Sequence, residues 1–358
     1  MQIPTAKPAR ELVRIGFVPL VDCALLAVAK EKGHFLRQHL DVELRKAQSW
    51  VQVQDKLLGG EWDAAHCLIT MPLQFALAAP PGDAPVGYAF TLSRNGNGLI
   101  LSNSLWNDGL RDPSGLQAWL GAHPDRVLRL GVVFQRGTQE YFLRSWLARG
   151  GLGLGDRIQL TVIPPQEMVG RLRKNEIDGF CAGEPWSRRA SASKLGRLVA
   201  DSGSLLPGLG EKVLGVRTAW HRSHSLAHSR LIRALSQASS WLADPANRPE
   251  AVEIIASKHY VNTPKTVVEG ALKDAAERGT PIASSAGVRF FGGGTDAPMQ
   301  SHARWYLEQM ERWGHMDVTA AREVDLASIC MEGFYQSVTG PIASRPPSHV
   351  VTGAAAPR

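Results

Sequence analysis

The first hundred residues alternate between strand-like and helix-like apolar patterns. Short apolar or period-two runs predict strands, and apolar residues that recur every three to four positions predict helices. The predicted strands are residues 12–20, 41–46, 63–69, 86–93 and 98–103, and the predicted helices are residues 23–35, 49–60 and 71–79. Strands that alternate with helices in this way indicate right-handed crossover units and mostly parallel sheets.

The same alternation restarts near residue 127, which predicts a second α/β lobe. The predicted strands are residues 127–134, 157–164, 177–183 and 196–202, and the predicted helices are residues 138–152, 165–176 and 184–193. Two open sheets that face each other form a cleft at the carboxyl ends of their strands, and helix N-termini point N–H groups into it. This geometry suits a binding protein that closes on its ligand.

The last third of the chain is mainly helical in pattern, and its end is rich in Pro, Ala and Ser. We therefore predict an α/β protein with this division: residues 1–94 as the N-terminal part of lobe 1, 95–218 as lobe 2, 219–340 as a helical return to lobe 1, and 341–358 as a disordered tail.

Composition narrows the class of protein. The chain has 358 residues, a net charge of +7 and four cysteines, none in a CxxC pair. The basic residues are spread along the chain, and their densest group (Arg188, Arg189, Lys194 and Arg197) lacks interleaved aromatics, so we expect no direct binding of nucleic acid. No apolar run reaches membrane-spanning length, and the N-terminus lacks the apolar region of a secretory signal. We expect a cytoplasmic protein with no membrane partner, the alternative being that an export signal was trimmed.

The motifs of common enzyme classes are missing. There is no G-x-G-x-x-G, no phosphate-binding P-loop and no G-x-S-x-G elbow. His221, His224 and His228 share one face if they lie on one helix, but no carboxylate or cysteine lies near them, so we expect a solvated face and no metal. We expect neither catalysis nor a cofactor. The open alternative is an enzyme acting on a small heterocyclic or sulfur compound.

Two residues suggest a binding site for an anion. Lys212 lies beside Glu211 in an otherwise small and apolar stretch, GLGEKVLGV (208–216). Trp50 follows a predicted strand at the start of a helix, and its indole N–H is a donor only, which suits an anion or carbonyl oxygen. Taken alone, Lys212 is also consistent with a solvated surface position, and Trp50 with core packing. Because adjacent strand residues face opposite ways, Glu211 is expected to face solvent if Lys212 faces the cleft.

Two glycine-containing turns are further candidates. In CAGEPWSRRA (181–190), Gly183 lets a ligand approach the backbone, and Glu184 falls at the start of a helix whose first turn suits Pro185. The same stretch also fits an ordinary strand-to-helix turn. RNGNG (94–98) lies between two strands, so we expect a turn with exposed asparagines and not a phosphate loop.

Long ordered blocks of the sequence resemble a known family. IGFVPLVDCALLAVAKEKGHF, SWVQVQDKLLGGEWDAAHCLITMPL, NGNG, GTQEYFLRSWLARGGL, GFCAGEPW, EKVLG and DAPMQSHARWYLEQMERWG are similar to the nitrate/bicarbonate solute-binding proteins of the NrtA/CmpA type. The resemblance covers about residues 13–337. It implies the two-lobed periplasmic-binding-protein-like (type II) architecture, with the anion in the interlobe cleft.

The resemblance also implies the ligand-binding residues: Trp50, Asn95, Gln139, Gly183, Glu184 and Lys212. Asn95 stands where the nitrate binders carry Gln, and Gln139 where they carry His. The bicarbonate branch has an acidic residue at the position of Lys212. Nitrate has only acceptor oxygens and needs one cation with several N–H donors, which these residues supply. Bicarbonate also carries a hydroxyl donor and needs an acceptor or a metal.

The missing export signal makes the chain most similar to the NasS branch of this family, the cytosolic nitrate/nitrite sensors. That resemblance implies a sensor that sequesters a NasT-like RNA-binding antitermination protein and releases it when nitrate or nitrite binds. The alternative is the anion-binding component of an ABC-type nitrate/nitrite transporter.

Overall fold

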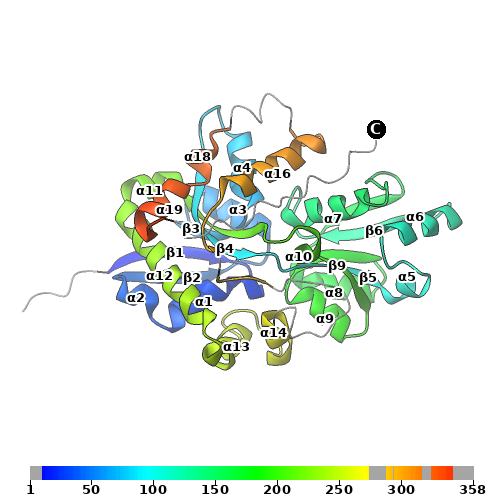
Figure 1. Cartoon of the computed structure of the whole chain (residues 1–358), viewed down its shortest axis with the longest axis horizontal. Helices are drawn as coiled ribbons and strands as arrows, with labels where there is room; N and C mark the ends of the chain where they lie inside the picture. Colours follow the sequence, from blue (N-terminus) through cyan, green and yellow to red (C-terminus); the bar gives the residue numbers. More distant parts are fainter. Residues whose placement is uncertain (1–9, 274–287, 293, 317–323, 342–358) are drawn as a thin grey trace, which may run out of the picture.

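The computed structural model describes residues 10–273, 288–292, 294–316 and 324–341, which form two lobes (Figure 1). Each lobe is built on a five-stranded sheet, with strand orders β2-β1-β3-β10-β4 and β7-β6-β8-β5-β9. The first sheet consists of β1 (Glu11–Phe17), β2 (Leu40–Lys46), β3 (Ala64–Leu68), β4 (Val86–Arg94) and β10 (Gly210–Arg217). The second consists of β5 (Asn97–Ser102), β6 (Leu128–Val132), β7 (Ile158–Val162), β8 (Gly179–Gly183) and β9 (Gly196–Asp201).

Both sheets are mixed, although the pattern predicts mostly parallel ones. β1 pairs in parallel with β2 and β3, and β6 with β7 and β8, as crossover units require. The strands that follow the two crossings between lobes run the other way: β10 is antiparallel to β3 and β4, and β5 is antiparallel to β8 and β9. Alternation of strands and helices predicts the crossover units but carries no signal for the direction of a strand that arrives from the other lobe.

Helices cover both sheets. In the first lobe they are α1 (Ala24–Glu31), α2 (His34–Arg37), α3 (Trp50–Leu58) and α4 (Thr70–Ala78), and in the second α5 (Asn103–Asn107), α6 (Pro113–Ala122), α7 (Thr138–Ala148), α8 (Met168–Arg173), α9 (Trp186–Ala192) and α10 (Ser202–Leu205). The described part of the chain also contains three short 3-10 turns: η1 (Val21–Cys23), η2 (Pro165–Glu167) and η3 (Pro245–Asn247). Ser49 caps α3, because its hydroxyl accepts from the N–H of Gln52.

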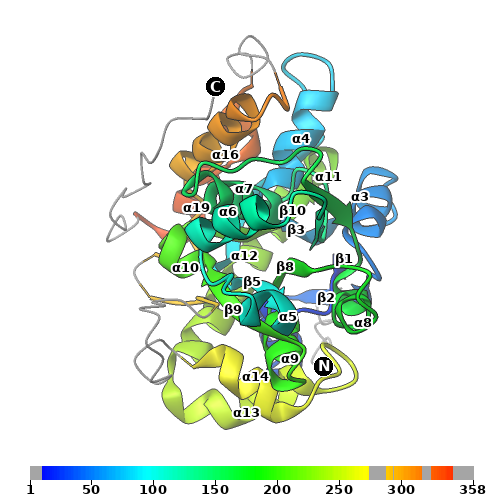
Figure 2. The same ribbon diagram turned by 90° about the vertical axis from the view of Figure 1, so that its right-hand side faces the viewer.

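The chain returns to the first lobe through β10 and a helical segment. Its described helices are α11 (Thr218–Ser223), α12 (Ser225–Ala243), α13 (Arg248–Ala256), α14 (Lys265–Leu272), α16 (Gln300–Arg312), α18 (Leu326–Ile329) and α19 (Glu332–Thr339). α12 packs on α1 and α2, and α16 on α4, while α14 lies beside α9 of the second lobe (Figure 2). The return crossing lies between β9 and β10, before the predicted boundary at 218. Residues 342–358 of the predicted tail lie outside the described residues.

The histidines at 221, 224 and 228 do not share one solvated face: His224 is exposed, but His228 is buried. His221 lies on α11 and His228 on α12, and His228 is fully buried with its Nδ1 2.9 Å from Nδ1 of His221. The break between the two helices turns His228 into the core. Burial lowers the pKa of His228 to about 3, so its ring is neutral at physiological pH.

Candidate functional site

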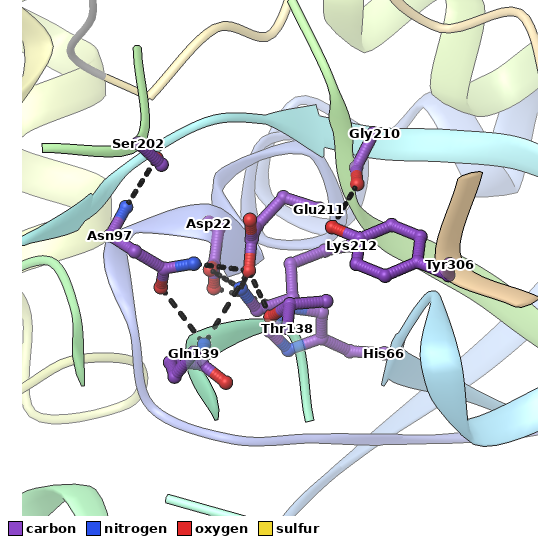
Figure 3. Close-up of polar contacts among 10 residues, drawn as sticks. All are labelled: Asp22, His66, Asn97, Thr138, Gln139, Ser202, Gly210, Glu211, Lys212 and Tyr306. Atoms are coloured by element: carbon purple, nitrogen blue, oxygen red, sulfur yellow. Dashed lines mark hydrogen bonds and ion pairs between the residues drawn. The ribbon is translucent and has the colours of Figure 1, made fainter. Parts of the chain in front are cut away.

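Polar side chains from both lobes form one buried cluster (Figure 3). From the first lobe, η1 follows β1 and carries Asp22, β3 carries His66, and β10 enters the sheet with Glu211 and Lys212. From the second lobe come the start of β5, the end of β8 and the N-terminus of α7. Ligands of open α/β sheets bind at the carboxyl ends of the strands, so the cluster is the candidate functional site.

Lys212 is a fully buried residue, not a surface lysine. Its side chain has 0% relative exposure, and its Nζ lies 3.0 Å from Oδ2 of Asp22 and 3.3 Å from Oε1 of Glu211. The ring centroid of Trp50 lies 5.9 Å from the same Nζ, within range of a cation–π contact. Two carboxylates and an aromatic face therefore surround one ammonium.

The two charges of the Lys212–Asp22 pair stabilise each other. Burial disfavours the ammonium, but the carboxylates of Asp22 and Glu211 more than offset this effect and raise the pKa of Lys212 above its ordinary value. Burial likewise acts to raise the pKa of Asp22, but Lys212 and His66 lower it below its ordinary value. Both groups are therefore ionised at neutral pH.

Glu211 reaches from the first lobe into a group of donors on the second. Its Oε1 accepts from Nδ2 of Asn97, from Oγ1 of Thr138 and, at 3.5 Å, from Nε2 of Gln139. The same Nε2 donates to Oδ1 of Asn97 at 2.8 Å. Asn97 begins β5, and Thr138 and Gln139 form the first turn of α7, so the N–H and O–H donors of two elements converge on one oxygen.

The expectation that Glu211 faces solvent is wrong. Its relative exposure is 3%, and its carboxylate shares the interlobe space with the ammonium of Lys212. The cause is a register shift in β10: Gly210 pairs with Arg94 and Lys212 with Ser93, so two steps along β10 match one along β4. A bulge of this kind disrupts the strict alternation of faces and re-aims side chains.

His66 and Trp50 complete the first-lobe side of the cluster. Nε2 of His66 lies 3.1 Å from Oδ1 of Asp22, and its ring meets the Trp50 ring edge-on at a centroid distance of 5.2 Å. The indole N–H of Trp50 is buried and has no hydrogen-bond partner among the described residues. An unpaired buried donor costs about 1–3 kcal/mol, so a ligand oxygen that accepts from it is favoured.

The structure brings four of the six predicted residues to this cluster: Trp50, Gln139, Gly183 and Lys212. Gly183 ends β8 with its Cα facing the polar groups, because a Cβ built there lies 3.6 Å from both Oδ2 of Asp22 and Oδ1 of Asn97. The missing side chain therefore leaves the backbone of Gly183 next to the charged groups.

The side chains of Asn95 and Glu184 have other partners. Asn95, which is buried and not exposed as expected, donates to the carbonyls of Ser202 and Leu206 and accepts from the N–H of Gly208, so it ties the two interlobe connections together. Its left-handed backbone (φ 57°) turns the chain so that Asn97, two residues later, carries its amide into the cluster.

The Glu184 side chain interacts with Arg188 at the start of α9. Its carboxylate pairs with the guanidinium of Arg188 at 3.1 Å and accepts from the Arg188 N–H at 3.4 Å, close to the helix-start role predicted. Its backbone carbonyl accepts from the N–H of Val21, which links β8 to the first lobe next to Asp22. Glu184 thus contributes to the wall of the site through its backbone.

Sequence reasoning missed Asp22, His66, Asn97 and Thr138. Asp22 and His66 are single polar residues inside the apolar runs LVD and AAHCL. A polar residue in such a run is the sequence feature that could have identified them as site residues. The Asn97 and Thr138 side chains carry no comparable signal, because their roles depend on where β5 and α7 start. Among the described residues, no group of three His, Cys, Asp or Glu side chains is arranged to hold a metal ion.

Comparison with protein families and curated relatives identifies similar chains. The model of the NMT1-like family matches residues 6–256. The chain is 32% identical to the bicarbonate transport ATP-binding protein CmpC of Synechococcus elongatus over 91% of its length and 49% of the relative. It is 34% identical to the nitrate import ATP-binding protein NrtC of Synechocystis, over 85% of its length and 46% of that relative. The chain thus spans about half the length of these relatives.

Relatives named as binding proteins are also similar. The nitrate/nitrite binding protein NrtA of Synechococcus elongatus is 32% identical over 85% of this chain and 72% of the relative. The crystal structure of the periplasmic nitrate-binding protein NrtA from Synechocystis superposes with a TM-score of 0.85 at 25% identity, over 93% of this chain and 89% of the other. The fold is therefore the two-lobed α/β fold of periplasmic binding proteins, as predicted. No described helix combines the length and hydropathy that crossing a membrane requires.

Proposed function

The chain belongs to the NMT1-like family and is homologous to the NrtA and CmpA binding proteins, and from this membership we propose that it binds nitrate or nitrite between its lobes and acts as a sensor of that anion. The observation that carries the proposal is the buried ammonium of Lys212 among converging amide and hydroxyl donors. Relatives of both nitrate and bicarbonate type match the chain, so the choice between the anions rests on the chemistry of the site.

The lysine at position 212, where the similar bicarbonate binders carry an acidic residue, favours nitrate or nitrite. Both anions carry only acceptor oxygens, and the cluster supplies one cation with the amides of Asn97 and Gln139, the hydroxyl of Thr138 and the indole N–H of Trp50. An ammonium and an anion 4 Å apart attract by about 4 kcal/mol at an effective dielectric constant near 20, before desolvation is subtracted.

We assign three roles to the six predicted residues. Lys212, Gln139 and Trp50 contact the anion by their side chains, Gly183 lets it approach the backbone, and Asn95 and Glu184 position the connections around it. This assignment adds Asn97 and Thr138 as donors.

Anion binding tests this proposal directly. Calorimetric titration of the whole chain should show binding of nitrate and nitrite, with weaker or no binding of chloride and bicarbonate. Lys212→Gln should weaken nitrate binding about 100-fold or more, because the cation of the site is lost while a neutral donor remains. Lys56→Gln is the matched control, since Lys56 pairs with Glu61 at the exposed end of α3. Failure of the wild type to bind either nitrate or nitrite would refute the proposal.

The sensor role concerns a second partner. We propose that the protein works in the cytoplasm and sequesters a NasT-like RNA-binding antitermination protein, which it releases when the anion binds. The support is the resemblance to the NasS branch. A ligand shifts such an equilibrium only by binding the two states with different affinity. Nitrate should therefore lower the affinity for a purified NasT-like protein, measured by fluorescence anisotropy, and an affinity that nitrate leaves unchanged would contradict release.

The second candidate is an anion-binding component of an ABC-type transporter. It is favoured by the functions of similar proteins, which include a nitrate import ATP-binding protein and a periplasmic nitrate-binding protein. Both candidates share the anion site and differ in location. Fractionation of cells that express the protein from its own gene decides between them, because a separate binding component that delivers the anion to a permease is found outside the inner membrane.

A further inference from the structure

One oxygen of Glu211 has the surroundings that an anion oxygen requires. Oε1 accepts from Asn97, Thr138, Gln139 and Lys212, and all five side chains are buried. Three of these donors belong to the second lobe and the carboxylate to the first (Figure 3). An anion that uses the same donors cannot do so while the Glu211 carboxylate accepts from them.

The charges around Lys212 also disfavour an anion beside an ionised Glu211. One ammonium already faces two carboxylates, Asp22 and Glu211. Other titratable groups surround this pair. His66 on β3 lies 3.1 Å from Asp22, and the Cys181 thiol on β8 and the Tyr306 hydroxyl on α16 are packed near Glu211. His302 on α16 accepts from the N–H of Gly210 next to Glu211, and burial lowers its pKa to about 3, so it is neutral. Burial, together with the Glu211 charge, raises the pKa of both Cys181 and Tyr306 well above the ordinary values, so neither adds charge at neutral pH. A bound nitrate would be the third negative charge on a single buried cation.

We propose, on the basis of the proposed function, that the Glu211 carboxylate competes with the anion for its binding site. Nitrate therefore binds with uptake of one proton by Glu211. Protonation removes the competing charge and leaves a neutral carboxyl group beside Lys212. The anion then accepts from Asn97, Thr138, Gln139 and Lys212 in place of Oε1.

Glu211 then determines the selectivity between nitrate and bicarbonate. Bicarbonate brings its own hydroxyl, which can donate to an ionised Glu211, whereas nitrate has no proton to donate. Nitrate affinity should therefore fall about tenfold for each unit of rising pH wherever one proton is taken up, and bicarbonate affinity should depend on pH much less. Selectivity for nitrate over bicarbonate increases as the pH falls.

The test measures protons and affinity together. Saturating sodium nitrate is added to the whole protein in weakly buffered solution free of sulfonate or phosphate, and a pH-stat records the acid needed to hold the pH at 7.5. Affinities are measured by calorimetry from pH 6 to 8.5. The proteins are the wild type, Glu211→Gln, His66→Gln and the control Glu167→Gln, which removes one charge from an exposed pair with Arg171.

The wild type, Glu167→Gln and His66→Gln should take up about one proton for each nitrate bound. Glu211→Gln should take up none and bind nitrate at least tenfold more tightly than the wild type at pH 8.5. Nitrate binding by the wild type without proton uptake overturns the inference but leaves the proposed function intact, and this measurement needs no variant. Uptake that persists in Glu211→Gln and disappears in His66→Gln also overturns it. Failure of all four proteins to bind nitrate or nitrite refutes the proposed function, and the inference with it.

Discussion

At the scale of single residues, the site depends on how the charge of Lys212 is balanced. A buried ammonium is tolerated only when carboxylates compensate its desolvation. Asp22 and Glu211 divide this task, but only Glu211 also accepts from the second lobe. The other oxygen of Asp22 lies 3.1 Å from His66, which also belongs to the first lobe. Asp22 is therefore the structural counter-charge of Lys212, and Glu211 the exchangeable one.

The structural role of Asp22 predicts a loss of stability on its replacement. Asp22→Asn should lower the free energy of unfolding at pH 7 by about 3 kcal/mol, because the charge of Lys212 loses its nearer partner. The pKa of Asp22 is lowered in the folded protein, so its contribution is complete above the ordinary value of 3.8 and is lost as the pH falls below it. Urea denaturation at several pH values measures both effects.

A matched control separates burial from charge. Glu43→Gln removes a carboxylate from an exposed pair with Arg45 and should change the free energy of unfolding by less than about 1 kcal/mol. Equal losses for Asp22→Asn and Glu43→Gln would show that the buried pair contributes no more than an exposed one.

At the scale of elements, hydrophobic pattern predicts most strands and helices but not the register between them. The stretch around Lys212 stands out in the sequence as small and apolar, yet the bulge that aims Glu211 inward depends on pairing with β4, which is more than a hundred residues away. Asn95 and Asn97 are equally plausible from the sequence. Only the left-handed turn at Asn95 decides which side chain enters the cluster. Residues placed by one element were thus predictable, and residues placed by pairing between elements were not.

The end of β8 gives a prediction at this scale. Gly183→Ala adds a methyl group with contacts of 3.6 Å or more, which is ordinary van der Waals distance, so the fold should accommodate it. The methyl group covers the backbone between Asp22 and Asn97, and nitrate affinity should fall about tenfold or more as a ligand loses close approach. Calorimetry measures the affinity, and thermal unfolding should show a midpoint near that of the wild type.

Gly121→Ala is the control for this substitution. Gly121 lies on α6, away from the cluster, with no atom within 4 Å of a built Cβ, so nitrate affinity should stay unchanged. Undiminished affinity in Gly183→Ala would show that the ligand does not approach β8.

At the scale of the whole molecule, the two lobes are joined by contacts well beyond the cluster. Gln166 of the second lobe donates to the carbonyl of Gln48, and Gln74 of the first donates to that of Arg136. His315, just after α16, lies 2.8 Å from the Tyr141 hydroxyl of α7. The restart of the strand–helix pattern predicts two lobes, but side-chain contacts such as these leave no periodic signal. The contacts that hold the two lobes together are therefore visible in the structure and were not predictable from the sequence.

Two buried histidines contribute to how the whole molecule responds to acid. Burial lowers the pKa of His228 and of His302 to about 3, and Nδ1 of His302 accepts from the N–H of Gly210 next to Glu211. Between the ordinary value near 6.5 and this lowered value, the unfolded chain binds more protons than the folded one, so stability falls as the pH falls. Each histidine should lower the free energy of unfolding by about 1.4 kcal/mol per pH unit within that window.

His302→Gln tests this acid response, because glutamine retains an acceptor for Gly210 but does not titrate. Urea denaturation between pH 6 and pH 4.5 should show a stability slope smaller than that of the wild type by about 1.4 kcal/mol per pH unit. His259→Gln, at an exposed position after α13, should leave the wild-type slope unchanged. If His302→Gln keeps the full wild-type slope, the buried ring is not held neutral, and the acid response of the molecule arises elsewhere.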